Sequence, residues 1–183
     1  MFAQIGVFLV DAVASFFVFV LLARFHFQWL RVPFRNPVGE FVLATTSWMV
    51  VPVRRFVPGL AGLDLASLGL AWAVQMLSLW AQAAIVGAEP SLGTIALIAL
   101  VDLLRYSLYI LVFAVIVQAV LSWVNPYTPV APAFDTLTRP FLRPIRRFVP
   151  PMGNVDLTPL VLLLVLYVLL IVVNHLRMSA AAF

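Results

Sequence analysis

The chain has 183 residues, of which 64% are hydrophobic and only 10% are charged, and its formal net charge is +4 at pH 7. A soluble domain carries roughly 25% charged residues, so this composition excludes an ordinary soluble protein and indicates an integral membrane protein. Cysteine is absent, which excludes disulfides, thiol catalysis and thiolate metal sites on this chain.

The first predicted transmembrane helix covers Ile5 to Ala23, an apolar run that only Asp11 interrupts. A helix needs roughly 20 apolar residues to cross the hydrocarbon of a bilayer, which this run nearly supplies. We interpret the run as a membrane span rather than a signal peptide, because no basic region precedes it and no convincing cleavage site is visible.

A basic connection follows the first span and contains the pentapeptide RRFVP at residues 54–58. Asp64 stands immediately before the next apolar run, where a carboxylate can accept hydrogen bonds from the unpaired amides of the first helical turn. The sequence therefore predicts that Asp64 caps the second span. The arginines of this connection are Arg24, Arg31, Arg35, Arg54 and Arg55.

The second span is predicted over Leu65 to Ala88 and the third over Tyr106 to Val124, both uncharged runs. In the short connection around residues 87–94, only Glu89 is charged. Asp102 and Arg105 fall just ahead of the third run and lie on one helical face, so they are expected to form a local ion pair.

A second basic connection, TRPFLRPIRRFVP over residues 138–150, precedes the fourth span, which is predicted over Leu157 to Asn174. Its prolines are expected to interrupt any regular helix and to hold the backbone in bent segments at the membrane interface. Asp156 directly precedes the fourth span and is predicted to cap it. The prolines are Pro140, Pro144 and Pro150, and the arginines are Arg139, Arg143, Arg146 and Arg147.

The two basic connections are related by an internal repeat. A gapless alignment of residues 37–68 with residues 129–160 superimposes both RRFVP segments and both aspartates that precede a span. A short gap farther back brings Trp29 opposite Trp123. We therefore expect an all-α membrane protein with a single transmembrane domain over 1–183. Its four transmembrane helices would form two tandem two-helix repeats, at about 1–88 and 92–176, each with a Pro/Arg-rich loop at the membrane interface.

The positions of the basic residues predict the orientation in the membrane. All 11 basic residues are arginine, and most of them lie in the two long connections. Because positively charged loops are retained on the cytoplasmic side, both connections are expected in the cytoplasm and both termini outside.

The second half also carries a family resemblance. The stretch VQAVLSWVNPYTPVAPAFDTLTRPFLRPIRRFVPPMGNVDLTPLVLLLVL resembles the signature region of the YggT family of small bacterial integral membrane proteins, which has cyanobacterial and chloroplast relatives. The matching positions are Ser122, Trp123, Asn125, Pro126, the segment 140–147, Pro150 and Asp156. The first half keeps the pattern at Arg24, Trp29, Pro52, Arg54, Arg55, Pro58 and Asp64.

The resemblance implies a bacterial inner-membrane protein with a non-enzymatic assembly or scaffold role, in the cell envelope, in division or in membrane-complex biogenesis. The predicted binding residues are the arginines at 54, 55, 139, 143, 146 and 147, which suit anionic lipid headgroups or an acidic protein partner. The second connection is expected to be the main contact surface, because the first has Ser47, Trp48 and Val51 where the second has Arg139, Pro140 and Arg143. A homo-oligomer is a further possible partner arrangement.

The alternative function is a small ion or proton transporter, or a channel related to osmotic stress. Asp11 and Asp102 both lie inside or close to apolar spans, where a carboxylate is a functional candidate by default. Arg105 and Gln118 would complete such an intramembrane polar site, although membrane helices also use glutamines to bond to one another.

Enzymatic, cofactor and nucleic-acid functions have no support in the sequence. His26 and His175 stand near opposite membrane surfaces, so they are not expected to share a metal ion. Neither a glycine-rich phosphate loop nor a serine–histidine–acid arrangement is visible. The positive net charge reflects the loop arginines and gives no separate indication of nucleic-acid binding.

Overall fold

The computed structural model describes residues 1–57, 59, 62–125, 127–148 and 156–180, so Pro58, Pro150 and Pro151 lie outside the described residues. All of its elements are helices. In chain order they are α1 (Phe2–Trp29), α2 (Pro37–Arg54), α3 (Leu65–Val86), α4 (Leu92–Val124), α5 (Ala131–Phe148) and α6 (Thr158–Ala180).

Four of these helices, α1, α3, α4 and α6, are long and apolar enough to cross a membrane. At 1.5 Å per residue, even the 22-residue α3 is roughly 33 Å long, which exceeds the ~30 Å hydrocarbon core. The prediction of an all-helical chain with four such helices is confirmed, and it indicates a multi-pass membrane protein. Large apolar side chains remain exposed along all four, such as Phe8, Leu77, Phe113 and Leu164, as lipid-facing surfaces require.

The predicted start of the third span at Tyr106 is wrong. The helix α4 begins at Leu92, and the side chain of Ser91 caps it by accepting a hydrogen bond of 3.1 Å from the backbone amide of Thr94. Asp102 and Arg105 do not end the apolar helix, because they pair with each other at 3.1 Å inside it. The mutual neutralisation of the two charges lets the helix continue through them.

The prediction that the prolines of the second basic connection interrupt any regular helix is also wrong. Both connections contain an 18-residue helix, with Pro52 inside α2 and with Pro140 and Pro144 inside α5. Pro140 and Pro144 are four residues apart and both exposed, so they share one outward face of α5. The carbonyl groups that lose their helical donors there face the surroundings rather than a packed interior, which reduces the penalty of each proline.

The beginning of α2 is fixed by a tight turn. Asn36 caps the helix by accepting a hydrogen bond of 3.0 Å from the amide of Gly39, and Pro37 occupies the first helical position. A Cβ atom on Gly39 would lie only 2.5 Å from the carbonyl oxygen of Phe34. The turn between α1 and α2 therefore requires glycine at this position.

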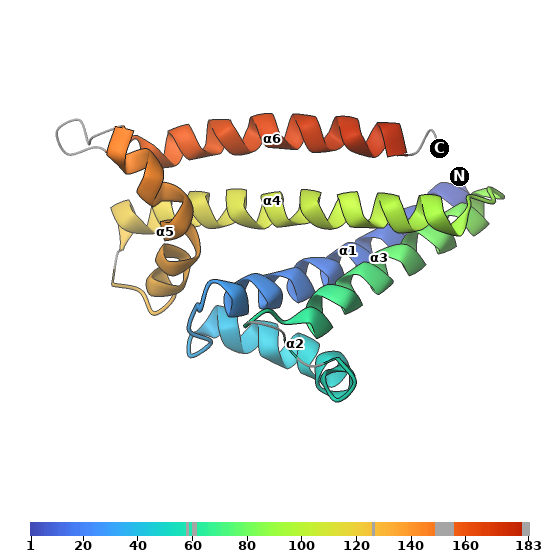
Figure 1. Ribbon diagram of the computed structural model, residues 1–183, viewed down its shortest axis with the longest axis horizontal. Helices are drawn as coiled ribbons and strands as arrows, with labels where there is room; N and C mark the ends of the chain where they lie inside the picture. The colour runs from blue at the N-terminus through green and yellow to red at the C-terminus, as the bar shows by residue number, and fades with distance from the viewer. Residues whose placement is uncertain (58, 60–61, 126, 149–155, 181–183) are drawn as a thin grey trace.

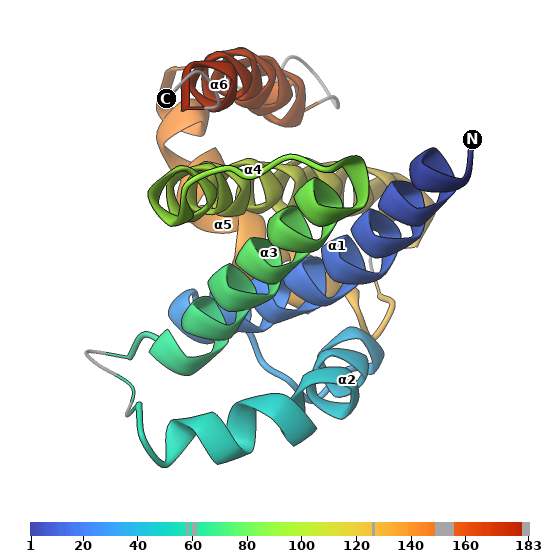
Figure 2. The same ribbon diagram turned by 90° about the vertical axis from the view of Figure 1, so that its right-hand side faces the viewer.

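The helices pack in two groups (Figures 1 and 2). The helix α1 packs along α3, α4 packs along α6, and α4 also contacts α1 and α3. The shorter α2 lies against α1 and α3, while α5 lies against α4 and α6. The beginning of α1 and the end of α6 lie at one end of the molecule, and α5 lies at the other (Figure 1).

Two hydrophobic clusters hold this arrangement together. The larger one joins α1, α2, α3, α4 and α5 through residues such as Leu21, Val50, Ala71, Ala114 and Phe134. The smaller one joins α4, α5 and α6 through Val115, Leu142, Leu162 and Leu166. Each short helix is thereby fixed on the long helices that precede and follow it.

Candidate functional site

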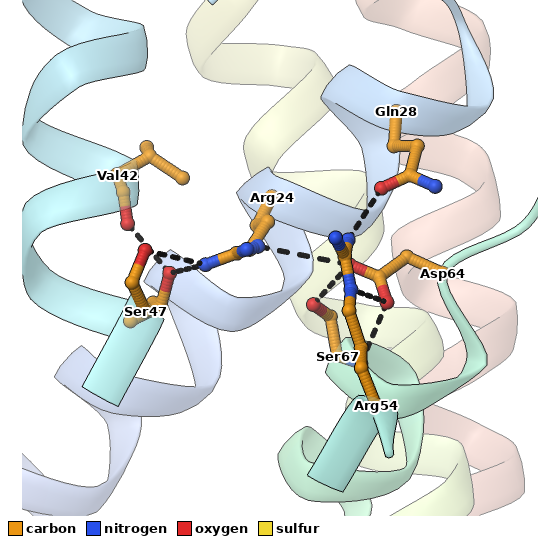
Figure 3. A network of polar contacts seen from close by, with 8 residues as sticks. Arg24, Gln28, Val42, Ser47, Arg54, Asp64 and Ser67 are labelled. Carbon is orange, nitrogen blue, oxygen red and sulfur yellow. Dashed lines mark hydrogen bonds and ion pairs between the residues drawn. The ribbon is translucent and has the colours of Figure 1, made fainter. Parts of the chain in front are cut away.

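A buried arginine joins three helices near the C-terminal end of α1. Arg24 is only 4% exposed, and its Nη1 atom donates hydrogen bonds to Thr46 Oγ1 at 2.8 Å and Ser47 Oγ at 3.2 Å, both on α2. On its other side, Arg24 Nε lies 3.6 Å from Asp64 Oδ2 at the start of α3. Figure 3 shows the Arg24 side chain reaching across between Ser47 and Asp64.

Asp64 is the centre of this network and is 1% exposed. Its carboxylate caps α3 by accepting from the amide of Ser67 at 3.3 Å, and it binds Arg54 Nη2 at 2.6 Å and Arg54 Nε at 3.2 Å. The two contacts from Arg54 form a two-pronged pair, the stronger kind of arginine–carboxylate interaction. Arg54 also donates to Gln28 Oε1 at 2.6 Å, which ties the end of α2 to α1.

The environment of Asp64 favours its charged form. Burial raises the pKa of the Asp64 carboxyl, but the hydrogen bonds from Arg54 and Ser67 and the positive charge of Arg54 outweigh burial. The pKa is therefore held below its ordinary value. A carboxylate that stays ionised is suited to holding the two guanidinium groups together.

A second buried network lies at the opposite end of the long helices. Asp102 on α4 is fully buried and binds Arg105 Nη2 at 3.1 Å and Arg177 Nε at 2.6 Å through one carboxylate oxygen. Its other oxygen accepts a hydrogen bond of 2.9 Å from Gln75 Nε2 on α3. The pair with Arg105 was expected, whereas Arg177 and Gln75 were not assigned to Asp102 from the sequence.

The residues expected to form one intramembrane polar site do not come together. Asp11 is exposed and accepts a hydrogen bond of 3.3 Å from Gln82, whereas the described partners of the Asp102 carboxylate are Gln75, Arg105 and Arg177. Gln118 lies 16 residues after Asp102 on the same helix, about 24 Å along its axis. Its Oε1 atom is buried without a hydrogen-bond partner among the described residues.

The outward face of α5 presents the arginines of the second basic connection. Arg139, Arg143, Arg146 and Arg147 are all exposed, while Phe134, Leu137 and Leu142 on the inward face are buried. Arg139 pairs with Asp135 at 2.6 Å one turn away. Within the described part of the chain, Arg143 and Arg147 form no ion pair.

Asp156 and Arg146 form a pair at 3.0 Å at the start of α6. Asp156 also accepts a hydrogen bond of 2.9 Å from the amide of Thr158, the first residue of the helix. Burial raises the pKa of Asp156, but the hydrogen bonds from Thr158 and the charge of Arg146 together outweigh burial, so the pKa lies below its ordinary value.

The remaining arginine of the first RRFVP segment, Arg55, is exposed immediately after α2. The histidine His26 is engaged locally, with Nδ1 2.7 Å from the carbonyl oxygen of Leu22. Among the residues that the structure describes, no group of at least three His, Cys, Asp or Glu side chains could hold a metal ion.

The chain resembles known proteins along most of its length. A family model described as CCB3/YggT matches residues 3–85 and 97–177. The chain is 33% identical over 163 residues to the uncharacterised protein YggT of Escherichia coli strain K12, covering 88% of this chain and 85% of that protein. It is 30% identical over 176 residues to an uncharacterised protein of Pseudomonas aeruginosa, covering 93% and 89%. No solved structure matches.

Proposed function

The chain belongs to the CCB3/YggT family, and from this membership and the surface of α5 we propose that it is a non-enzymatic scaffold that holds a partner at the membrane surface. The protein would act in the bacterial inner membrane, in assembly of the cell envelope, of the division machinery or of another membrane complex. Its partner would be an acidic protein segment, with anionic lipid headgroups as supporting contacts.

The observation that carries the proposal is the separation of the two faces of α5. The apolar face is buried against α4 and α6, so the helix is held in place by packing rather than by any partner. The arginines on the other face project from a rigid element and not from a flexible loop. Rigid presentation favours binding, because less conformational freedom is lost when a partner docks.

Arginine is the suitable residue for this task. Its planar guanidinium group can make two parallel hydrogen bonds to a carboxylate or phosphate, which a lysine ammonium cannot. Arg143 and Arg147 stand one helical turn apart on α5 and are not occupied by acidic side chains of the described chain. These two residues are therefore the central contacts in the proposed interaction.

We further propose that residues 1–88 and 92–176 are copies of one unit. Both contain a long helix, a short amphipathic helix and a second long helix, and in both an aspartate near the last helix binds the first arginine of an RRFVP segment. With an even number of spans in each copy, α2 and α5 would lie on the same side of the membrane. The positive-inside pattern supports the cytoplasm as that side.

The experiment is a comparison of two double variants of equal charge. Arg143→Lys with Arg147→Lys should reduce the yield of partner crosslinked in native membranes, because two-pronged contacts are lost while the charge is kept. Arg31→Lys with Arg35→Lys is the matched control, since both are exposed arginines in the connection between α1 and α2. Equal capture by the wild type and both variants would reject a specific role for the α5 arginines.

The alternative, transport of protons or cations, has one specific observation in its favour. Gln75, Ser78 and Gln82 are spaced to lie along one face of α3, where Gln75 donates to Asp102 and Gln82 donates to both Ser78 and Asp11. Transport is the second choice of function, because the Asp102 carboxylate is already bound by Arg105, Arg177 and Gln75. Vesicles with the wild-type protein that conduct no ions would reject it, whereas flux abolished by Asp11→Asn with Asp102→Asn would support it.

A further inference from the structure

The two halves of the molecule differ at one position that decides what each can bind. A register of 94 residues places Val18 and Phe19 on Val112 and Phe113, and Trp29 on Trp123. In the same register, the buried Arg24 of the first half corresponds to Gln118 of the second. This comparison rests on the two halves being copies of one unit, as proposed above, and not on the capture of a protein partner.

The first half supplies two guanidinium groups to its aspartate. Arg54 binds Asp64 at 2.6 Å and Arg24 lies 3.6 Å from the same oxygen, which leaves the Asp64 carboxylate 1% exposed. In the second half, Arg146 binds Asp156 at 3.0 Å, but the shorter and uncharged Gln118 stands where the other guanidinium would be. Asp156 is 38% exposed.

A pocket of about 250 Å³ lies at this position in the second half. Its polar lining includes the Asp156 carboxylate and the Gln118 amide, whose buried Oε1 has no donor among the described residues. The Asp156 carboxylate and the Oε1 atom of Gln118 are hydrogen-bond acceptors, so this part of the pocket suits a cation that donates hydrogen bonds. Trp123 also lines the pocket, and an aromatic face attracts a cation.

The other residues that line the pocket indicate which kind of ligand the cationic group belongs to. Arg146 provides a positive group suited to a phosphate beside the ammonium site. The first turns of α6 provide apolar walls, including Leu160, which is 59% exposed toward the outside of the helical bundle. An ammonium group, a phosphate and an apolar body occur together in one class of molecule that surrounds a membrane protein, the aminophospholipids.

We propose that this pocket binds a phospholipid with a primary ammonium headgroup, of the phosphatidylethanolamine type. The ammonium donates to Asp156 and to Gln118 Oε1, and so takes the place that the Arg24 guanidinium fills in the first half. The phosphate lies against Arg146, and the acyl chains follow the apolar surface of α6. A quaternary choline headgroup has no N–H donor and cannot satisfy Gln118 Oε1.

The test is native mass spectrometry of the full-length protein with added dioleoyl phosphatidylethanolamine or dioleoyl phosphatidylcholine. We expect the wild type to retain the ethanolamine lipid roughly tenfold better, the difference expected when a charge-assisted hydrogen bond is lost. Gln118→Arg should abolish the preference while keeping the thermal unfolding temperature, because it places a guanidinium in the pocket as Arg24 does in the first half. Asp135→Asn is the control, since this carboxylate on α5 lies outside the pocket lining.

A second readout identifies the source of the ammonium group. A water-soluble carbodiimide couples a carboxylate to a nearby primary amine and takes up the released water as its urea. The expected product at Asp156 is therefore an amide that adds the mass of phosphatidylethanolamine less one water. Coupling to a lysine of another protein instead would overturn the lipid assignment. Equal retention of both lipids by the wild type, or undiminished ethanolamine preference in Gln118→Arg, would also overturn it.

Discussion

Arg24 Nε lies 3.6 Å from Asp64 Oδ2, and the two side chains are 4% and 1% exposed. The first residue belongs to the last two turns of α1, and the second is the N-cap of α3. Since Arg24 also binds α2 through Thr46 and Ser47, this ion pair holds the three helices of the first half at a single point.

Asp64→Asn should destabilise the protein by about 3–5 kcal/mol, because it leaves the buried charge of Arg24 without its anion. The measurement is the unfolding free energy, or the unfolding temperature, in detergent micelles. Asp135→Asn is the matched control, since it breaks an exposed pair with Arg139 and should change stability by about 0–1 kcal/mol. Similar small effects of both variants would show that the Asp64 network contributes little.

Stability should depend on pH through Asp64. The folded-state pKa of this carboxyl is lowered, so its contribution is fully present above the ordinary value of 3.8 and is lost as the pH falls through the lowered folded-state value. Unfolding temperatures of the wild type and Asp64→Asn, measured from pH 7 downward, should therefore differ at neutral pH and converge in acid. A difference between them that stays constant at all pH values would contradict this assignment.

Arg54→Lys should lower the unfolding free energy by about 1 kcal/mol, because one ammonium cannot replace the contacts that Arg54 makes to Asp64 and Gln28. Arg55→Lys should have no measurable effect, since Arg55 is exposed and forms no ion pair with the described residues. Chemical or thermal unfolding of the two variants side by side tests this difference. If Arg55→Lys proves the more damaging change, the role assigned to Arg54 is wrong.

Arg177→Met should weaken the attachment of α6 to α4, because it removes the closest partner of the buried Asp102, at 2.6 Å. The loss should be about 3 kcal/mol, at the lower end for breaking a buried pair, since Arg105 still binds the same carboxylate. Limited proteolysis should then cleave near α6 faster than in the wild type. Unchanged proteolysis and stability would show that α6 is held by its apolar contacts alone.

The orientation in the membrane is tested with reporter fusions. Fusions after Gly59 and after Pro151 should report a cytoplasmic location, and a fusion after Glu89 an external one, because the arginines concentrate in the first two regions. Opposite locations for the first two fusions would contradict the proposed parallel arrangement of the two halves.

The apolar runs predicted the four long helices well, because lipid-facing helices need uninterrupted apolar sequence whatever their neighbours are. The predictions from the sequence failed where the effect of a charge or a proline was judged only from its neighbours in the chain. Tyr106 was taken as the start of a span because Asp102 and Arg105 precede it, whereas the charge of Asp102 is compensated in part by Arg177, 75 residues away. Such a partner becomes visible only when the helices are packed.

Predictions for the short helices failed for the same reason. Pro140 and Pro144 favour a break when each is considered alone, but their shared outward face and the burial of Leu137 and Leu142 on the opposite face stabilise a continuous helix. Arg24 was assigned to a cytoplasmic connection by its charge. The proposed repeat contains a signal for this buried position, since Gln118, which aligns with Arg24 in that repeat, lies well inside an apolar run.

The separation of 75 residues between Asp102 and Arg177 also imposes an order on biosynthesis. At a translation rate of 5–20 residues per second, roughly 4–15 s pass between the synthesis of the two residues. During that interval Asp102 must leave the ribosome and enter the membrane without its partner from α6. Gln75 precedes it in the chain and Arg105 follows it within one helical turn, so the local pair at 3.1 Å accompanies the aspartate through insertion until the last helix arrives.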